Sequence, residues 1–63
     1  MEHLIYRLDS PEVMLKNIEG EDQTLNENEA LLFPTREDAL TIIDSLSGGA
    51  DFWGTRKPRP RDN

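Results

Sequence analysis

TREDALTIIDSLSGG, residues 35–49, is the stretch that decides the fold. Thr35 is a typical helix N-cap, and the first turn after it is acidic, with Asp38 at the spacing of a capping box. Apolar residues then recur at three- and four-residue spacing, which predicts one buried face made of Ala39, Leu40, Ile42, Ile43 and Leu46. Gly48-Gly49 ends the pattern. We predict a helix over Arg36–Ser47.

Three runs of strand-forming residues precede this helix. His3–Leu8 alternates apolar side chains between two faces, and Val13–Ile18 is a second such run. Asp9–Glu12 between them is a turn that contains a proline, and so short a link makes the two strands antiparallel. Gly20 breaks the second run, and Gln23–Leu25 is expected to form a third, short strand.

The segment between the third strand and the helix has two possible structures. Asn26 could cap a single helical turn that continues to Ala30, or the whole stretch could be loop, and we favour the turn. Leu31–Phe33 comes after it as a short extended piece, because Pro34 biases Phe33 away from helical angles. The prediction is an α+β fold: a small three- to four-stranded antiparallel sheet covered on one face by one C-terminal helix, with an extended basic tail.

The second face of the predicted sheet lacks a cover. The first two strands carry apolar residues on both sides, while a single helix buries only one side. Two covers are possible: Phe52-Trp53 folded back, or the same face of a second copy in a two-fold dimer. A chain of 63 residues gains from such association, because a domain of this size buries only about 60% of its unfolded surface.

Charge divides the chain into two parts. Residues 1–53 hold three Lys or Arg and twelve carboxylates, whereas the last ten residues hold four cations and one carboxylate, for a net charge of −6. We therefore expect an acidic sheet-and-helix domain over residues 1–49 and an aromatic, basic, proline-containing tail over residues 50–63. Opposite fields at the two ends are typical of a protein that contacts other macromolecules.

The tail supplies the candidate partner-binding residues. Phe52 and Trp53 are expected to anchor an interface, because Trp dominates interface energies; the alternative is that Trp53 caps the small core. Four cations among prolines would contact phosphates or an acidic protein surface, or else form a solvated terminus: Arg56, Lys57, Arg59 and Arg61.

Residue content argues against catalysis and cofactors. The chain has no cysteine and a single histidine, His3, so disulfides and a four-ligand zinc site are not expected. Hydroxyls without a placed base do not make a nucleophile, and the acidic turn around Gly20 lacks the order of a calcium loop. We expect no enzyme activity, no metal and no cofactor. The N-terminus does not resemble a signal peptide, and no apolar run is long enough to cross a membrane, so we expect a cytoplasmic protein.

Ala30–Ala39, ALLFPTREDA, together with Met14-Leu15-Lys16, resembles a pattern found in small bacteriophage proteins with a strand-strand-helix order. In that pattern a Tyr-Leu-Lys-like triplet lies on the second strand, and an Ala-x-x-Phe-x-Thr entry leads into the terminal helix. The resemblance covers about residues 3–47. It implies a protein that acts in the host cytoplasm by binding a host protein or nucleic-acid machine. Proteins of this kind include anti-defence factors.

The leading hypothesis is thus a non-enzymatic, dimeric, phage-encoded binding protein that inhibits or modulates a host macromolecule. The alternative is a nucleic-acid accessory protein that uses its basic tail on phosphates. A third possibility is a structural component of a virion or larger complex, assembled through the apolar sheet face.

Overall fold

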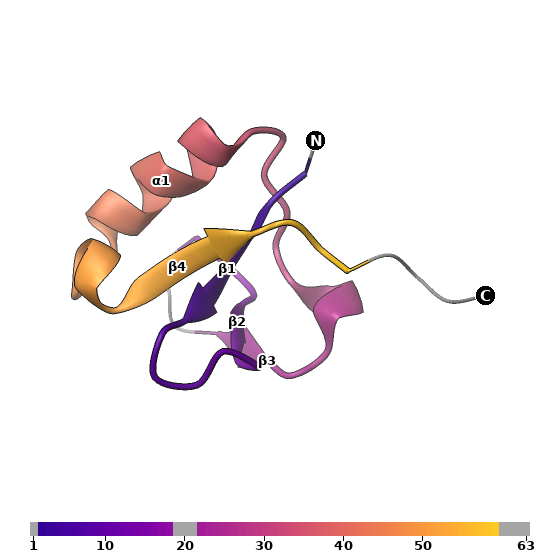
Figure 1. The fold of residues 1–63 in the computed structure, drawn as a ribbon. Helices are drawn as coiled ribbons and strands as arrows, with labels where there is room; N and C mark the ends of the chain where they lie inside the picture. Colours follow the sequence, from indigo (N-terminus) through magenta and orange to yellow (C-terminus); the bar gives the residue numbers. More distant parts are fainter. Residues whose placement is uncertain (1, 19–21, 60–63) are drawn as a thin grey trace.

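A computed structural model describes residues 2–18 and 22–59, and the predicted break at Gly20 and the cation Arg61 lie outside these ranges. Figure 1 shows one α-helix beside a small twisted sheet, with short 3-10 turns in two of the connections. In chain order the elements are β1 (Leu4–Arg7), β2 (Met14–Leu15), β3 (Gln23–Thr24), η1 (Glu27–Glu29), α1 (Arg36–Ser45), η2 (Gly49–Asp51) and β4 (Trp53–Arg56).

The four strands form one open sheet in the order β3-β2-β1-β4, and every neighbouring pair is antiparallel. The predicted α+β class, with a small antiparallel sheet and one helix, is therefore confirmed. β1 pairs with β2 at Tyr6–Met14 and with β4 from Leu4–Arg56 to Arg7–Trp53. The N-terminal strand thus lies in the middle of the sheet, and the C-terminal strand forms one edge.

The fourth strand lies in a segment that was not expected to form one. Leu31–Phe33 contributes only a bridge, in which His3 and Phe33 exchange two backbone hydrogen bonds of 2.8 Å. The additional strand is β4, inside the segment that was expected to be a tail, so the boundary expected between residues 49 and 50 does not mark the end of the sheet. The sequence did not indicate β4 as a strand, because Gly54 and the cations after it give this run an unusual composition for a strand.

The helix begins where its cap predicts and ends earlier. The Thr35 hydroxyl accepts a hydrogen bond from the Asp38 amide at 3.1 Å, which confirms the N-cap. The helix ends at Ser45 instead of Ser47, because the Leu46 amide donates to Ile43 O at 3.0 Å in a tighter turn. Gly48 then adopts φ +89°, a left-handed conformation that L side chains disfavour.

The connection before α1 is also as predicted. η1 forms a single turn over Glu27–Glu29, and the Asn26 side chain caps it by accepting from the Asn28 amide at 3.0 Å. Figure 1 shows this turn lying at the opposite end of β1 from η2. Of the two predicted possibilities, the single turn is therefore confirmed and the loop is not.

Both faces of the sheet carry a buried cluster. The helix-side cluster is the larger, and it consists of Ile5, Leu15, Phe33, Ala39, Ile43, Leu46 and Trp53. On the other side of the sheet, which we call the second face, Leu4, Met14 and Ala30 are buried and Tyr6 packs against them. The segment that leads to α1 therefore covers part of the second face through Ala30.

Trp53 does not cover the second face, contrary to one of the two possibilities that the sequence left. It stands opposite Arg7, and side chains alternate along a strand, so it projects to the same side of the sheet as Ile5. Its exposure is only 5%, and it packs in the helix-side cluster. Within residues 2–18 and 22–59, the remainder of the second face is open.

Candidate interaction groove

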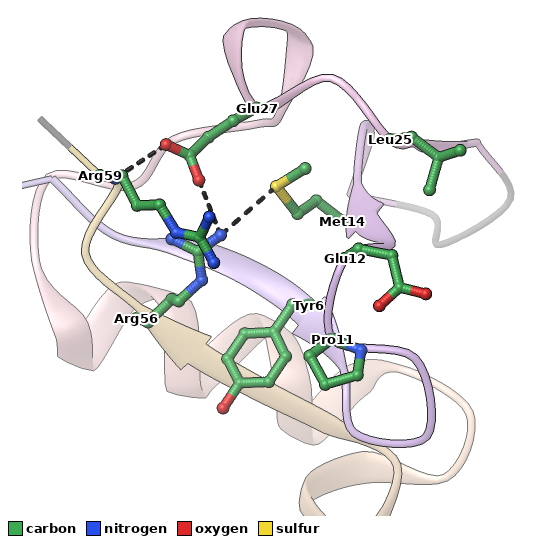
Figure 2. Close-up of a pocket in the computed structure, with 8 residues that line it drawn as sticks. All are labelled: Tyr6, Pro11, Glu12, Met14, Leu25, Glu27, Arg56 and Arg59. Atoms are coloured by element: carbon green, nitrogen blue, oxygen red, sulfur yellow. Dashed lines mark hydrogen bonds and ion pairs between the residues drawn. The ribbon is translucent and has the colours of Figure 1, made fainter. Parts of the chain in front are cut away.

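A groove of about 470 Å³ occupies the open part of the second face. Figure 2 shows its lining, with Arg59, Glu27 and Arg56 gathered at one end and Pro11, Glu12 and Leu25 at the other. Tyr6 and Met14 lie between the two ends, and these two residues are directly paired across β1 and β2. The groove thus combines an apolar middle with a charged end.

Tyr6 owes its position to Gly54 on the neighbouring strand. A Cβ built on Gly54 would lie 2.8 Å from Tyr6 Cζ and 2.9 Å from Tyr6 Oη, so the phenol occupies the space that any other residue would fill. Leu8 Cδ2 approaches the same point at 3.0 Å. A glycine in an edge strand therefore lets an aromatic side chain of β1 lie across β4.

Glu27 holds the charged end together. One carboxylate oxygen accepts from Arg56 Nη2 at 2.7 Å, and the other accepts from the Arg59 backbone amide at 2.8 Å. Arg56 Nη2 also lies 3.9 Å from Met14 Sδ, which joins the ion pair to the apolar middle. The body of the same chain therefore fixes the C-terminal segment as far as Arg59.

This arrangement lowers the pKa of Glu27 below its ordinary value. The hydrogen bond from Arg56 is the largest cause, and the Arg59 amide together with the charges of both arginines acts in the same direction. Partial burial opposes these effects by disfavouring the charged form. Glu27 is consequently a carboxylate at neutral pH, and its pair with Arg56 is about three-quarters covered, with side-chain exposures of 26% and 29%.

Apolar side chains at the rim of the second face remain exposed. Leu25 lines the groove and is 73% exposed, and Leu8, near Tyr6, is 45% exposed. Exposed apolar side chains that are grouped beside a polar rim mark interaction surfaces, whereas isolated ones have no special meaning. The groove has the features of a docking surface: aromatic and thioether contact area, with a charged pair to fix orientation.

The aromatic pair predicted to bind a partner makes contacts within the fold. Trp53 Nε1 donates to Ser47 O at 3.1 Å, and the Phe52 and Trp53 rings meet edge to face at 5.4 Å. The Arg7 guanidinium lies 4.9 Å from the centre of the Phe52 ring, which is half-buried. Trp53 thus has the core position that was the alternative to an interface anchor.

The four predicted cations have different surroundings. Arg56 and Arg59 line the groove, where Arg56 is paired with Glu27. Lys57 is exposed, and no ion pair of the described chain includes it. Arg61 is outside the part of the chain that the structure describes. The structure therefore brings two of these cations into the site.

No pattern in the sequence marked Glu27, Leu25 and Met14 as members of a site. The apolar alternation of Leu4, Tyr6 and Leu8 did indicate an uncovered second face, and it was the usable signal for the groove. Glu27 carried no such signal, because its partners Arg56 and Arg59 are about thirty residues away along the chain.

Comparison with protein-family models, with curated proteins and with solved structures finds no match to this chain. Within residues 2–18 and 22–59, no helix is long and apolar enough to cross a membrane. The same residues contain no group of three or more His, Cys, Asp or Glu side chains arranged to hold a metal ion.

Proposed function

We propose that this chain is a non-enzymatic binding protein that docks onto a partner macromolecule through the groove on its second face. The observation that carries the proposal is the composition of this groove: Tyr6, Met14 and the exposed Leu25 stand beside a fixed Glu27–Arg56 pair. A side chain inserted from a partner would gain apolar contact in the middle of the groove and orientation from the charged end.

The biological role is inferred from the resemblance of Ala30–Ala39 to small phage proteins. We propose that the partner is a host protein or a protein–nucleic-acid complex, and that binding inhibits or modulates it in the host cytoplasm. The net charge of −6 supports a target with a basic surface, because opposite fields accelerate encounter.

Leu25→Glu tests the groove. Leu25 is so exposed that the substitution leaves the core intact, yet it puts a charge where apolar contact is expected. Ile18→Glu is the matched control, because Ile18 is 56% exposed and is not part of the groove lining. Each variant, tagged and checked for folding by circular dichroism, is used to capture proteins from a host lysate, and the bound proteins are quantified.

We expect the specifically captured protein to be lost with Leu25→Glu and retained with Ile18→Glu. The reason is that a charge buried in a docking surface without a partner costs several kcal/mol of affinity, while a charge outside the surface costs little. Equal capture by both variants would rule out the groove as the docking surface.

The second candidate is a nucleic-acid accessory protein. Its support is the exposure of Lys57 and of Arg59, whose side chain makes no ion pair among the described residues. The pairing of Arg56 with Glu27 counts against this second function, because one of the four cations is already neutralised. This function predicts binding to a single- or double-stranded oligonucleotide that weakens steeply with salt, and the absence of binding at low salt would exclude it.

A further inference from the structure

Among the described residues, no strand pairs with the outer edge of β4. β4 is the last strand in the sheet order, and in the described part of the chain only β1 bonds to it. Figure 1 shows β4 as the yellow strand that runs from η2 toward the C-terminus, with β1 behind it. An edge of this kind presents backbone donors and acceptors that can pair with another strand.

Two hydrogen bonds establish which backbone groups of β4 face outward. The Arg7 amide donates to Val13 O at 2.9 Å, on the β2 side, whereas the Leu8 amide donates to Phe52 O at 3.0 Å, on the β4 side. Hydrogen-bonded and non-hydrogen-bonded pairs alternate along an antiparallel ladder. Gly54 and Arg56 therefore direct their backbone groups to β1, and Trp53 and Thr55 direct theirs to the open edge.

The two ends of this edge carry opposite charge. Near its start lie η2 and the C-terminal end of α1, with Asp44 and Asp51 exposed and no basic residue in the last turn of the helix. A helix C-terminus adds partial negative charge. Beyond its end lie Lys57 and Arg59, both exposed. An antiparallel copy of the same edge would place each negative end beside a positive one.

We propose that two copies of this chain pair along β4, antiparallel, with Trp53 opposite Thr55 of the partner subunit. In this register the two-fold axis passes beside Gly54, the outward backbone groups of both strands meet, and the two sheets become one of eight strands. Lys57 then comes near Asp51 of the partner subunit, and the contact occurs twice because the interface is two-fold. The proposal is separate from the groove and does not depend on the proposed function.

A second copy fits this edge because the edge complements itself. An unrelated strand would need to supply both an acidic group near Lys57 and a basic group near Asp51, whereas the chain already has both in the required order. Association also adds buried surface, which a domain of this size lacks.

Native mass spectrometry and light scattering of the full chain test the proposal. We expect a species of twice 7.2 kDa whose fraction rises with concentration. Lys57→Glu and Asp51→Lys should each raise the dissociation constant roughly tenfold or more, because each sets like charges together at both ends of the interface. The double variant exchanges the charges and should restore dimerisation. Lys16→Glu, which makes the same change in charge at an exposed position outside β4, should leave the dimer intact.

Amide hydrogen exchange tests the register independently of charge. Gly54 and Arg56 bond to β1 within one chain, so their protection should not depend on concentration. The amides of Trp53 and Thr55 should become protected only as the dimer forms.

A single chain at every concentration would overturn the proposal, and so would a dimer that the charge exchange does not restore or that leaves the Trp53 and Thr55 amides unprotected. Protection of these amides only when another protein is added would overturn it as well, because the edge would then take a different partner.

Discussion

Gly54 shapes the groove because it is the position over which Tyr6 lies. Its missing side chain lets the phenol cross β4, with Cζ and Oη less than 3.0 Å from where a Cβ would stand. The ring is the far end of a side chain with two torsions, so it can move away if a methyl group is introduced. At the scale of one residue, the packing around Tyr6 is therefore the feature of the groove that is most sensitive to substitution.

Gly54→Ala is expected to destabilise the protein by about 1–2 kcal/mol, which is the usual cost of an added methyl in a packed site. Urea unfolding measures this cost, and the Tyr6 ring resonances report the displacement of the ring. In a Tyr6→Ala background the same substitution should cost much less, because most of the clash is gone. An equal cost in both backgrounds would mean that Tyr6 is not what Gly54 accommodates.

Glu27→Gln removes the acceptor charge that orders Arg56 and the Arg59 backbone. We expect a loss of roughly 0.5–1 kcal/mol in the free energy of unfolding at pH 7, since the pair is partly covered but reaches solvent. Glu12→Gln, at the other end of the groove and outside any ion pair of the described residues, is the control and should change stability very little.

The difference in the free energy of unfolding between the wild type and Glu27→Gln should depend on pH with a definite sign. The pKa of Glu27 is lowered in the folded state, so the folded protein binds the proton less readily than the unfolded chain does. The stabilisation is complete above the ordinary pKa of 4.5 and is lost as the pH falls through the lower, folded pKa. The wild type and Glu27→Gln should therefore converge in stability in acid. A difference that stays constant below pH 4.5 would contradict the role of this carboxylate.

Among the elements, α1 offers the most direct test of a local sequence signal. Thr35→Ala should cost about 1 kcal/mol, because the Asp38 amide loses its acceptor at the helix N-terminus. Thr41→Ala is the matched control on the same helix. Its hydroxyl donates to the Glu37 carbonyl within the helix, and Ala has the higher helix propensity, so thermal unfolding should show no loss. Equal losses would contradict a capping role for Thr35.

Elements with a local cause were predictable from the sequence. The capped start of α1, the Asn26-capped turn and the first three strands each depend on neighbouring residues, although every strand proved shorter than expected. β4 was missed because it is formed by pairing with β1, about fifty residues earlier in the chain. Gly54 weakened the strand signal, although this same residue makes room for Tyr6.

The groove was only half predictable, for the same reason. Alternation in β1 predicted an apolar second face, and residues Arg56 and Arg59 were singled out for their charge. Their meeting with Glu27 depends on where β4 ends relative to η1, which is a property of the complete sheet. Trp53 is the opposite case. Its size predicted an interface anchor, but the register with Arg7 places it in the core.

At the scale of the whole molecule, the sheet has two surfaces available for contacts. The groove lies on the second face, and the edge of β4 that no described strand pairs with lies at one side of the sheet. Gly54 and Arg56 connect them, because they belong to β4 while Arg56 also lines the groove and Gly54 lies under Tyr6. A dimer through β4 would bring two copies of the groove onto one continuous sheet face.

The measurement that tests the central claim most directly is a backbone and side-chain NMR titration of the labelled chain with the protein that it captures. We predict that the largest shift changes occur on the second face, at Tyr6, Met14, Leu25 and Arg56, while the exposed side of α1 stays unchanged. Changes confined to α1, or to Lys57 and Arg59 with Tyr6 and Leu25 unaffected, would contradict the assignment of the groove as the docking surface.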